Sequence, residues 1–419
     1  MSQSRSAIAV DAAVSANRRP LWRLALRRRL LDSIATKLSV GSLSVQLPSG
    51  EILVFDSAGS QGAPSQPAAS IVLIRWRTLR RLVADGDIGF AEAYLDGDWS
   101  SPDVPALIEL AARNDQGLGS VIDGILPLRL FNRWRHAMRS NSRKGSRRNI
   151  PRHYDLGNAF YAEWLDAGMT YSSAIYRSAD QSIEAAQREK QDRVIELLDL
   201  RSGSRVLEIG CGWGGLAERI VRQDEIRLTG ITLSPAQLAY AQQHVAKAGV
   251  SEFTDLRLQD YREVEGKFDR IVSIEMLEAV GQAYWPTYFS TLRERLVPGG
   301  VAVLQGITID DHRFVTYQNS IDFIQRYIFP GGMLPSVGEM RRQIEQAGLR
   351  LVSVETFGQS YARTLAEWNR RFQAAWPKIE QMGFSLRFKR MWEYYLAYCE
   401  GGFTAGAIDV GLFKIECPA

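Results

Sequence analysis

The stretch that decides the fold of this chain is Arg205–Gly215, which reads RVLEIGCGWGG. Its first half, residues 206–209, is a short apolar run of the kind that forms a buried strand. Glycines follow at positions 210, 212, 214 and 215, and the next residues, LAERIVRQ, have the pattern of a helix. Glycine allows a sharp backbone turn and a close approach to a ligand. The stretch therefore predicts the first half of a βαβ nucleotide-binding unit.

The position of an acidic residue separates two kinds of nucleotide site. A dinucleotide site places an acid near the end of the second strand, where it binds the ribose. Here that strand, residues 226–231, ends in TLSP without an acid, whereas Glu208 lies inside the first strand. The pattern E-x-G-x-G-x-G over residues 208–214 resembles the S-adenosylmethionine (SAM) loop of class I methyltransferases. A glycine turn without a ligand is the competing interpretation.

Length and composition predict two domains in a cytoplasmic protein. The chain has 419 residues, of which 45% are hydrophobic and 23% charged, and a formal net charge of +4; these values are ordinary for soluble globular proteins. Its three cysteines lack CxxC spacing, which disfavours disulfides and a metal site and suits a reducing compartment. No apolar run reaches the roughly 20 residues that cross a bilayer. Residues 1–17 also lack the apolar core of a signal peptide.

Changes in amino-acid composition along the chain predict four segments. Residues 1–18 are small and polar and predict a disordered tail. Residues 19–125 predict a small α+β domain, which opens with a helix that interleaves apolar and basic residues. This helix either lies on anionic lipid or packs on its own domain with a solvated basic face. Residues 126–149 form a basic linker, and residues 150–419 carry the glycine loop.

Within the first domain, apolar alternation around PSG predicts a hairpin over residues 44–55, and a further strand is expected over residues 71–75. Helices are expected over residues 78–83 and 104–114. The stretch GDIGFAEAYLDGDWSS, residues 86–101, lies between them. This part of the chain shows neither metal-ligand spacing nor an acid–base pair.

The linker and the residues just after it are unusually basic and contain no acid. Their basic residues are Arg129, Arg133, Arg135, Arg139, Arg143, Lys144, Arg147, Arg148 and Arg152. Such a run usually contacts polyanions or is solvated. Because no nucleic-acid recognition motif accompanies it, we do not expect a nucleic-acid partner. An anionic phospholipid surface fits the charge, at about 1 kcal/mol per basic residue.

The second domain alternates strands and helices, which predicts a parallel sheet covered on both faces. Strands are expected over residues 206–209, 226–231, 253–258, 268–273 and 301–307, with LVPGG as a turn before the last. Ligands bind at the carboxyl ends of such strands. The polar residues expected at those ends are Glu208, Thr232, Asp260, Glu275, Glu278 and Gln305.

Several further stretches resemble the cyclopropane-fatty-acyl-phospholipid synthase family, which includes the mycolic acid cyclopropane synthases. They are HYDLGN (153–158), MTYS (169–172), GITLS (230–234), FDRIVS (268–273), YIFPGG (327–332), YARTL (361–365) and YYL (394–396). GFAEAYLDGDW, residues 89–99, is similar to the amino-terminal lipid-associating domain of the phospholipid-acting members. The fold that this resemblance implies is a class I SAM-dependent methyltransferase sheet with a small α+β domain before it.

The resemblance implies a SAM-dependent transfer of a methyl group to the double bond of an unsaturated phospholipid acyl chain. The resulting carbocation loses a methyl proton and closes a cyclopropane ring; aromatic side chains can stabilise such a cation through their π faces. The expected protein is cytoplasmic and peripherally associated with the inner face of an anionic membrane, and a homodimer is compatible with the sequence.

The resemblance also implies a bicarbonate that accepts the proton and is held by a Glu, a His, a Tyr and backbone groups. The matching residues are Glu278 and Tyr361, but Gln305 replaces the His, and Ala279 follows Glu278 where the family commonly has a His. Glutamine can donate a hydrogen bond but cannot carry a proton at neutral pH. Either bicarbonate binds more weakly, or Glu278 acts alone as base.

The remaining site residues follow from the same resemblance. Cys399 matches a cysteine often described as catalytic, but no neighbouring base would activate it. His153 and Ile307 are expected to line the substrate or bicarbonate site. The expected SAM-binding residues are Tyr171, Ser172, Glu208, Gly210, Gly212, Gly214, Thr232, Ser234, Gln237, Tyr261 and Arg262.

Three alternatives stay open. Methyl transfer can end in a methyl-branched or methylene-bearing chain when the carbocation shifts a hydride instead of closing a ring. A methyltransferase with a non-lipid acceptor would keep the glycine loop but would not need the basic linker. A catalytically silent lipid-binding protein would explain Gln305 and Ala279.

Overall fold

The computed structural model describes residues 21–57, 67–122, 156–223 and 225–419. The expected tail (1–18), the expected linker (126–149) and His153 lie outside these residues. Among the described helices, none combines the length and apolar composition that crossing a bilayer requires.

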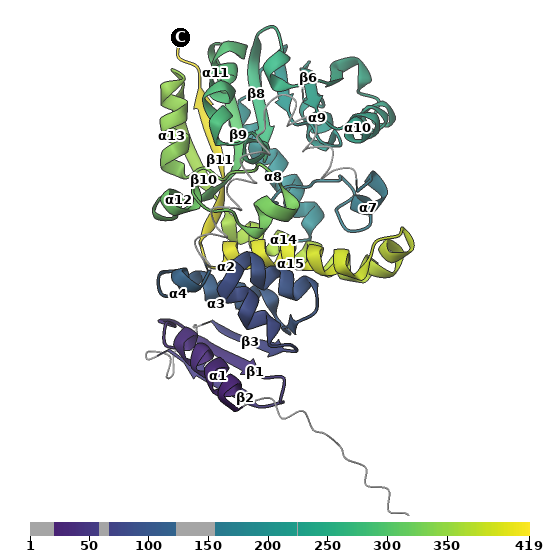
Figure 1. Ribbon diagram of the computed structural model, residues 1–419. Coiled ribbons are helices and arrows are strands. Elements are labelled where there is room, and N and C mark those ends of the chain that lie inside the picture. The colour runs from purple at the N-terminus through teal and green to yellow at the C-terminus, as the bar shows by residue number, and fades with distance from the viewer. Residues whose placement is uncertain (1–20, 58–66, 123–155, 224) are drawn as a thin grey trace, which may run out of the picture.

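The N-terminal part of the chain forms a four-stranded sheet in the order β2-β1-β3-β4 (Figure 1). β1 (Ser42–Gln46) pairs antiparallel with β2 (Ile52–Asp56), which confirms the expected hairpin. β1 also pairs parallel with β3 (Ala68–Leu73), and the short β4 (Trp99–Ser100) lies antiparallel to β3.

Helices pack beside this sheet, and one of them is longer than the sequence indicates. They are α1 (Leu21–Ala35), α2 (Arg77–Leu95), α3 (Val104–Arg113) and α4 (Asp115–Ile122). The helix expected over residues 78–83 lies in the first half of α2; the helical conformation breaks at Gly86 (φ 61°, ψ −138°), and a second half that was not expected continues to Leu95. Ile88, Ala91 and Leu95 share one buried face of this second half, and that burial stabilises it as a helix.

The second sheet has seven strands in the order β10-β11-β9-β8-β5-β6-β7. They are β5 (Arg205–Ile209), β6 (Arg227–Thr232), β7 (Thr254–Leu258), β8 (Phe268–Ile274), β9 (Leu296–Ile309), β10 (Arg350–Thr356) and β11 (Ile408–Glu416). The first five pair in parallel, as predicted. β11 runs antiparallel to both its neighbours, so the sheet is mostly rather than entirely parallel. The LVPGG segment, expected as a turn, lies within β9.

Helices cover both faces of the seven-stranded sheet, and the strands alternate accordingly. Val206 and Val272 pack on the face of α8 (Ile183–Leu198), α9 (Gly215–Val221) and α10 (Pro235–Lys247). Their neighbours Leu207 and Ile271 pack on the opposite face. That face is covered by α11 (Trp285–Arg295) and α13 (Val337–Gln346). This period-2 alternation is what a doubly covered sheet requires.

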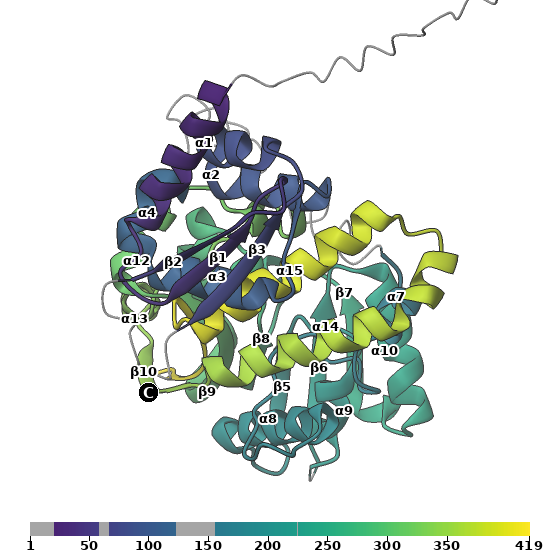
Figure 2. The same cartoon turned by 90° about the horizontal axis from the view of Figure 1, so that it is seen from below.

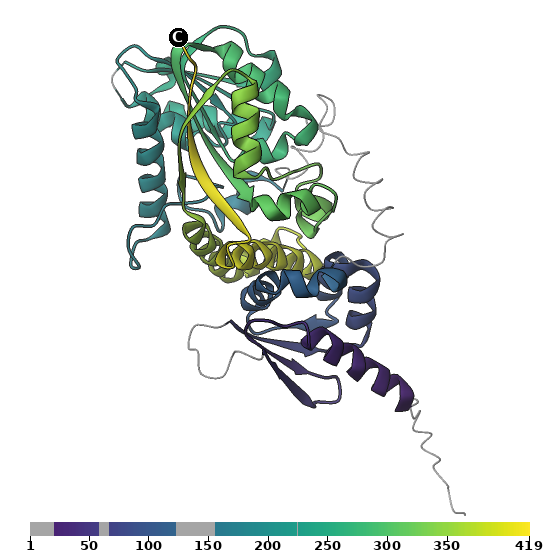
Figure 3. The same cartoon turned by 90° about the vertical axis from the view of Figure 1, so that its left-hand side faces the viewer.

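Two long C-terminal helices join the sheet to the N-terminal part. α14 (Gly358–Gln381) and α15 (Leu386–Thr404) cross the molecule side by side (Figure 2) and form a layer between the two sheets (Figure 3). At Gly401 of α15 the α3 helix is so close that a Cβ would lie 2.7 Å from Ile108. Shorter elements complete the fold: α7 (Asn158–Ala162), η1 (Ser251–Phe253), η2 (Tyr261–Glu263), η3 (Leu277–Ala279), η4 (Gln282–Tyr284), α12 (Asp311–Tyr317) and the π-helical η5 (Ile324–Ile328).

Candidate active site

A pocket lies at the carboxyl ends of β5 and β6, beside the glycine loop. Gly210 (φ 89°), Gly212 (φ 51°) and Gly214 (φ 88°) all adopt the left-handed conformation that glycine tolerates. On β6, a Cβ at Gly230 would approach the Leu256 side chain to 2.6 Å, so the strands and the loop are tightly packed here. The turn thereby leaves backbone groups at the pocket wall.

Most of the expected SAM-binding residues line this pocket, and three do not. Those on its wall are Tyr171, Ser172, Glu208, Gly210, Gly212, Thr232, Gln237 and Tyr261. Ser234 instead caps α10 by accepting a hydrogen bond from the Gln237 backbone N–H. Arg262 pairs with Asp260, at 2.6 Å, and Gly214 lies at the start of α9. These three residues therefore support the loops rather than face the pocket.

Two buried titratable side chains, Glu208 and Lys190, line the pocket. Burial raises the pKa of Glu208 to about 8, and one of its carboxyl oxygens, Oε2, has no hydrogen-bond partner in the described structure. Lys190 of α8, which the sequence did not single out, donates a hydrogen bond from Nζ to Ser172 Oγ at 2.7 Å. Burial lowers the pKa of Lys190 to about 8, against the opposing charges of Glu275, Asp166 and Glu208. The unpartnered oxygen points to a polar ligand in this pocket.

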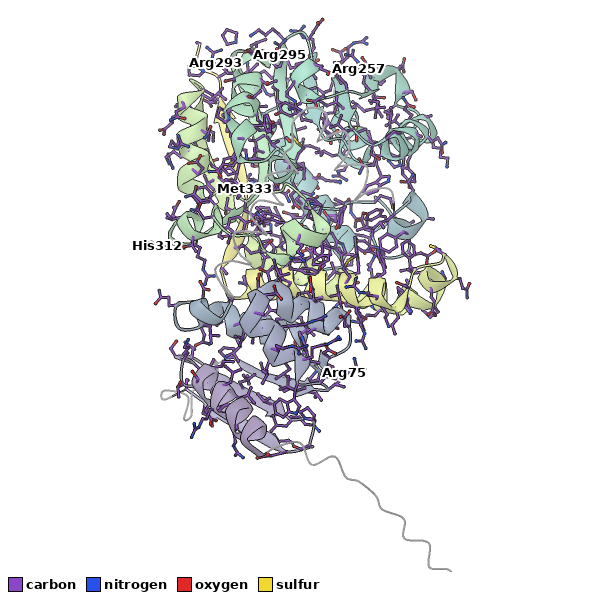
Figure 4. The ribbon with its side chains drawn as sticks, in the orientation of Figure 1. Arg75, Arg257, Arg293, Arg295, His312 and Met333 are labelled. Atoms are coloured by element: carbon purple, nitrogen blue, oxygen red, sulfur yellow. The ribbon has the colours of Figure 1, made fainter. Side chains whose placement is uncertain are left out.

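A much larger cavity, of about 940 Å³, lies between the seven-stranded sheet and the N-terminal helices. Its volume is near the upper end of the range of ligand sites, roughly 300–1,000 Å³. Most of its inner wall is apolar or aromatic: Phe90, Ile307, Phe329, Tyr361, Leu365, Tyr394, Tyr395, Tyr398 and Phe403. Met333 belongs to this wall inside the molecule, and His312 of α12 lies at the outer edge (Figure 4). Helices α2, α3 and α4 supply one side of the cavity, and Phe90 lies on α2.

The pocket and the cavity share three wall residues, Tyr171, Glu275 and Ala279. Tyr171 is held there by a 2.8 Å hydrogen bond between its hydroxyl and that of Tyr395. A molecule in the pocket and a molecule in the cavity can therefore meet at these residues.

The predicted catalytic residues gather near this junction, but not around Glu278. Glu275 Oε1 accepts hydrogen bonds from Gln305 Nε2 at 2.7 Å and Ser173 N at 2.8 Å. Its other oxygen, Oε2, accepts one from the Tyr361 hydroxyl at 2.6 Å. Glu278 lines the cavity, where its Oε1 accepts a hydrogen bond from the Ile307 backbone N–H at 2.6 Å. Its Oε2 is buried and has no partner in the described structure.

Cys399 of α15 also lines the cavity. Burial raises the pKa of its thiol far above the usual range, and the nearby carboxylates of Asp322 and Glu275 add to this effect. The side chain is therefore a neutral thiol at pH 7, and neutral thiols are poor nucleophiles. Within the described residues, no group of three or more His, Cys, Asp or Glu side chains is arranged to hold a metal.

The sheet order, with one antiparallel strand inserted beside β9, and the glycine loop after β5 define the class of protein. It is a SAM-dependent methyltransferase of class I. The pocket fits SAM, because it combines backbone groups of the glycine loop, hydroxyls, and an unpartnered buried carboxyl oxygen.

Comparison with known proteins defines the family. The family model described as mycolic acid cyclopropane synthetase matches residues 141–413, and the chain belongs to this family. The tuberculostearic acid methyltransferase UfaA1 of Mycobacterium tuberculosis is 38% identical, over 92% of this chain and 90% of that protein. The cyclopropane-fatty-acyl-phospholipid synthase of Escherichia coli is 37% identical, over 80% of this chain and 84% of that protein.

Solved structures support the same family assignment. The cyclopropane synthase MmaA2 of Mycobacterium tuberculosis superposes with a TM-score of 0.61 at 29% identity, covering 64% of this chain and 98% of that chain. The mycolic acid cyclopropane synthase CmaA1, complexed with SAH and CTAB, gives 0.58 at 30% identity, with 64% and 98% covered. The chain is thus an enzyme that uses SAM.

Proposed function

We propose that this enzyme transfers a methyl group from SAM to the double bond of an unsaturated acyl chain carried by a phospholipid, and that a cyclopropane ring is the product. The observation that carries this proposal is the meeting of the SAM pocket with a large aromatic cavity at Tyr171, Glu275 and Ala279. An extended apolar tail suits such a cavity, whereas a small polar acceptor would leave most of its apolar wall without contacts.

The residues of the chain contribute mainly alignment and exclusion of water. Bound SAM supplies an electrophilic methyl group at the junction. The alkene is a weak nucleophile, so holding it against that methyl group lowers the barrier chiefly by orientation. The rings of Tyr171, Tyr361 and Tyr395 surround the junction, and their π faces stabilise a carbocation without trapping it. Burial raises the pKa of Tyr361 well above its usual value, so its hydroxyl stays a hydrogen-bond donor.

We also propose that the enzyme works at the inner face of an anionic membrane. The N-terminal helices supply one wall of the cavity, so a lipid bound there lies beside the part of the chain that precedes the basic linker. The membrane partner and a homodimer remain predictions from the sequence.

A methyl-branched or methylene-bearing chain is the second candidate product, because the name of one relative favours it. The relative that matches over 92% of this chain carries the name of a tuberculostearic acid methyltransferase, not of a cyclopropane synthase. The methylene product requires a hydride shift from the methyl-bearing carbon to the cationic carbon before the methyl proton leaves, whereas the ring closes without this shift.

The test uses purified enzyme, tritium-labelled SAM and vesicles of a monounsaturated anionic phospholipid. We expect label in the extracted phospholipid and, by proton NMR of the acyl tails, cyclopropane resonances rather than vinylic methylene resonances. Vinylic methylene resonances would establish the second candidate. Label on protein or on a soluble molecule would indicate a non-lipid acceptor, and bound lipid without label would indicate a silent lipid-binding protein.

A further inference from the structure

Glu275 occupies an unusual place at the end of β8. Its backbone is in the left-handed region (φ 49°), which costs a residue with a side chain on the order of 1 kcal/mol. Its N–H donates to the carbonyl of Gln305 on the neighbouring strand at 2.8 Å. Strain of this kind persists only where the surroundings enforce it. The conformation directs the carboxyl group to the wall that the SAM pocket and the acyl cavity share.

Three donors from distant parts of the chain converge on this carboxyl group. They are the Tyr361 hydroxyl from α14, the Gln305 amide from β9, and the Ser173 backbone N–H from the segment before α8. A carboxylate, which only accepts hydrogen bonds, satisfies all three. Burial raises the pKa of Glu275, whereas its hydrogen bonds and the nearby charge of Lys190 act against this rise and favour the ionised form.

This arrangement uses the side-chain donors that the bicarbonate implied by the family resemblance would need. That anion would need the side chains at positions 305 and 361 as donors, and both of these donors are already bonded to Glu275. The residues present therefore do not fit a separate bound bicarbonate. The donors at positions 305 and 361 instead fit a carboxylate that a side chain of the protein supplies, that of Glu275.

Glu278 is the other carboxyl group at the cavity, and its surroundings differ. Its contacts are with backbone N–H groups, of Ile307 and of Glu278 itself, and its second oxygen, Oε2, is buried without a partner in the described structure. Burial, and then the nearby Glu275 charge, raise the pKa of Glu278 to about 8. At pH 7 it is mostly protonated, so it is a poor acceptor for a further proton.

We propose that Glu275 is the catalytic base of this enzyme and takes the place of the bicarbonate that the family resemblance implies. This inference rests on the proposed function. The π pair of the alkene forms the new carbon–carbon bond while the methyl–sulfur bond breaks and leaves its pair on sulfur. A carbocation remains on the second alkene carbon. A methyl C–H bond then breaks, its proton passes to a Glu275 oxygen, and its electron pair forms the ring bond.

The same base serves the methylene product. There, a hydride first moves from the methyl-bearing carbon to the cationic carbon, and the electron pair of the broken methyl C–H bond forms a double bond. In both cases the proton ends on Glu275. The three donors place its oxygens at the junction, where the new methyl group forms.

The test compares the wild-type enzyme with two variants in buffer freed of carbon dioxide, with and without added bicarbonate or formate. We expect little change in the wild-type rate between these buffers. Glu275→Gln should lose about 100-fold or more in every buffer, within the usual range for removal of a general base. Glu275→Gly, which suits the left-handed backbone, should be slow without an anion and recover severalfold with bicarbonate or formate.

Matched controls separate catalysis from folding. Glu225 is also a glutamate with positive φ (53°), but it is exposed and lies far along the sheet from the cavity, so Glu225→Gly should leave turnover unchanged. SAM binding and thermal unfolding of each variant show whether the pocket and the fold persist.

Three results would overturn the assignment of Glu275. They are a wild-type enzyme that needs bicarbonate, an active Glu275→Gln enzyme, and a folded, SAM-binding Glu275→Gly enzyme that neither anion rescues. A wild-type enzyme that methylates no acyl chain in any buffer would instead refute the proposed function, and the inference with it.

Discussion

The SAM pocket and the acyl cavity meet at one wall but are built in opposite ways. The largest continuous part of the pocket wall is one motif, the β5 strand and its glycine turn, and residues 168–172 and the ends of β6 and β8 complete it. The cavity draws its wall from α2, α3, α12, β9, α14 and α15, which are spread over most of the chain. Local backbone geometry thus shapes the centre of the SAM pocket, whereas long-range packing shapes the whole acyl cavity. Substitutions should therefore separate cofactor binding from acyl-chain binding.

The largest difference between the effect on SAM binding and the effect on acyl-chain binding is expected from Gly212→Val. Gly212 has positive φ and its Cβ position faces open space at the pocket, so a valine side chain would occupy part of the SAM site. We expect SAM affinity to fall about 100-fold, or about 2.8 kcal/mol, by calorimetry. Gly203→Val is the matched control, since Gly203 also has positive φ and open space but lies outside both cavities. Equal losses in both variants would show that backbone strain, not the pocket, is responsible.

A smaller effect is expected on the acyl side from Ala111→Phe. Ala111 lines the cavity from α3, where a phenyl ring would shorten the space for the tail. Turnover of a long monounsaturated chain should fall about tenfold, which is about 1.4 kcal/mol. SAM affinity should stay unchanged, and shorter acyl chains should be less affected than long ones. An equal loss for all chain lengths would contradict this placement of the tail.

Glu278 predicts a dependence of stability on pH. Its pKa in the folded protein, about 8, is raised from the ordinary 4.5 chiefly by burial. A raised carboxyl pKa stabilises the fold below the unfolded pKa, and this contribution is lost as pH rises through the folded pKa. Between these pH values the slope is on the order of 1 kcal/mol per pH unit. Urea unfolding from pH 5 to 8 should show a shallower decline for Glu278→Gln than for wild type; parallel declines would disprove the assignment.

The smallest effect is expected from Cys399→Ser. Burial keeps the thiol neutral, and no step of the proposed reaction requires a thiolate. We expect turnover within about threefold of wild type, less than about 0.7 kcal/mol. A loss comparable with that of Glu275→Gln would show that the cysteine takes part in the reaction.

The contrast between the locally formed SAM pocket and the acyl cavity also explains which parts of the site could be predicted from the sequence. The pocket was predictable because neighbouring residues such as Gly210, Gly212 and Thr232 form it, and their spacing alone indicates a turn and a strand end. Lys190 was not predicted, because a lysine within a helical pattern is usually exposed to solvent. Only the packing of α8 shows that it is buried beside Glu208 and Ser172.

The acyl side was only partly predictable. The aromatic character of the C-terminal region was evident, but not that α2 would extend to Leu95 and help to close the cavity. Glu275 was placed at a strand end, yet its donors lie about 30, 86 and 102 positions away in the chain. No local pattern contains such a convergence. The resemblance therefore assigned Tyr361 and Gln305 to an anion near Glu278, whereas the structure bonds both to Glu275.

The most direct test of the account follows the hydrogens of the transferred methyl group. The enzyme is given SAM with a trideuterated methyl group and a monounsaturated phospholipid, and the acyl tails are analysed by mass spectrometry. The account predicts a gain of one carbon with two deuterium atoms, because the third leaves as a deuteron to Glu275. Retention of all three deuterium atoms, or no gain of mass in the tails, would contradict it.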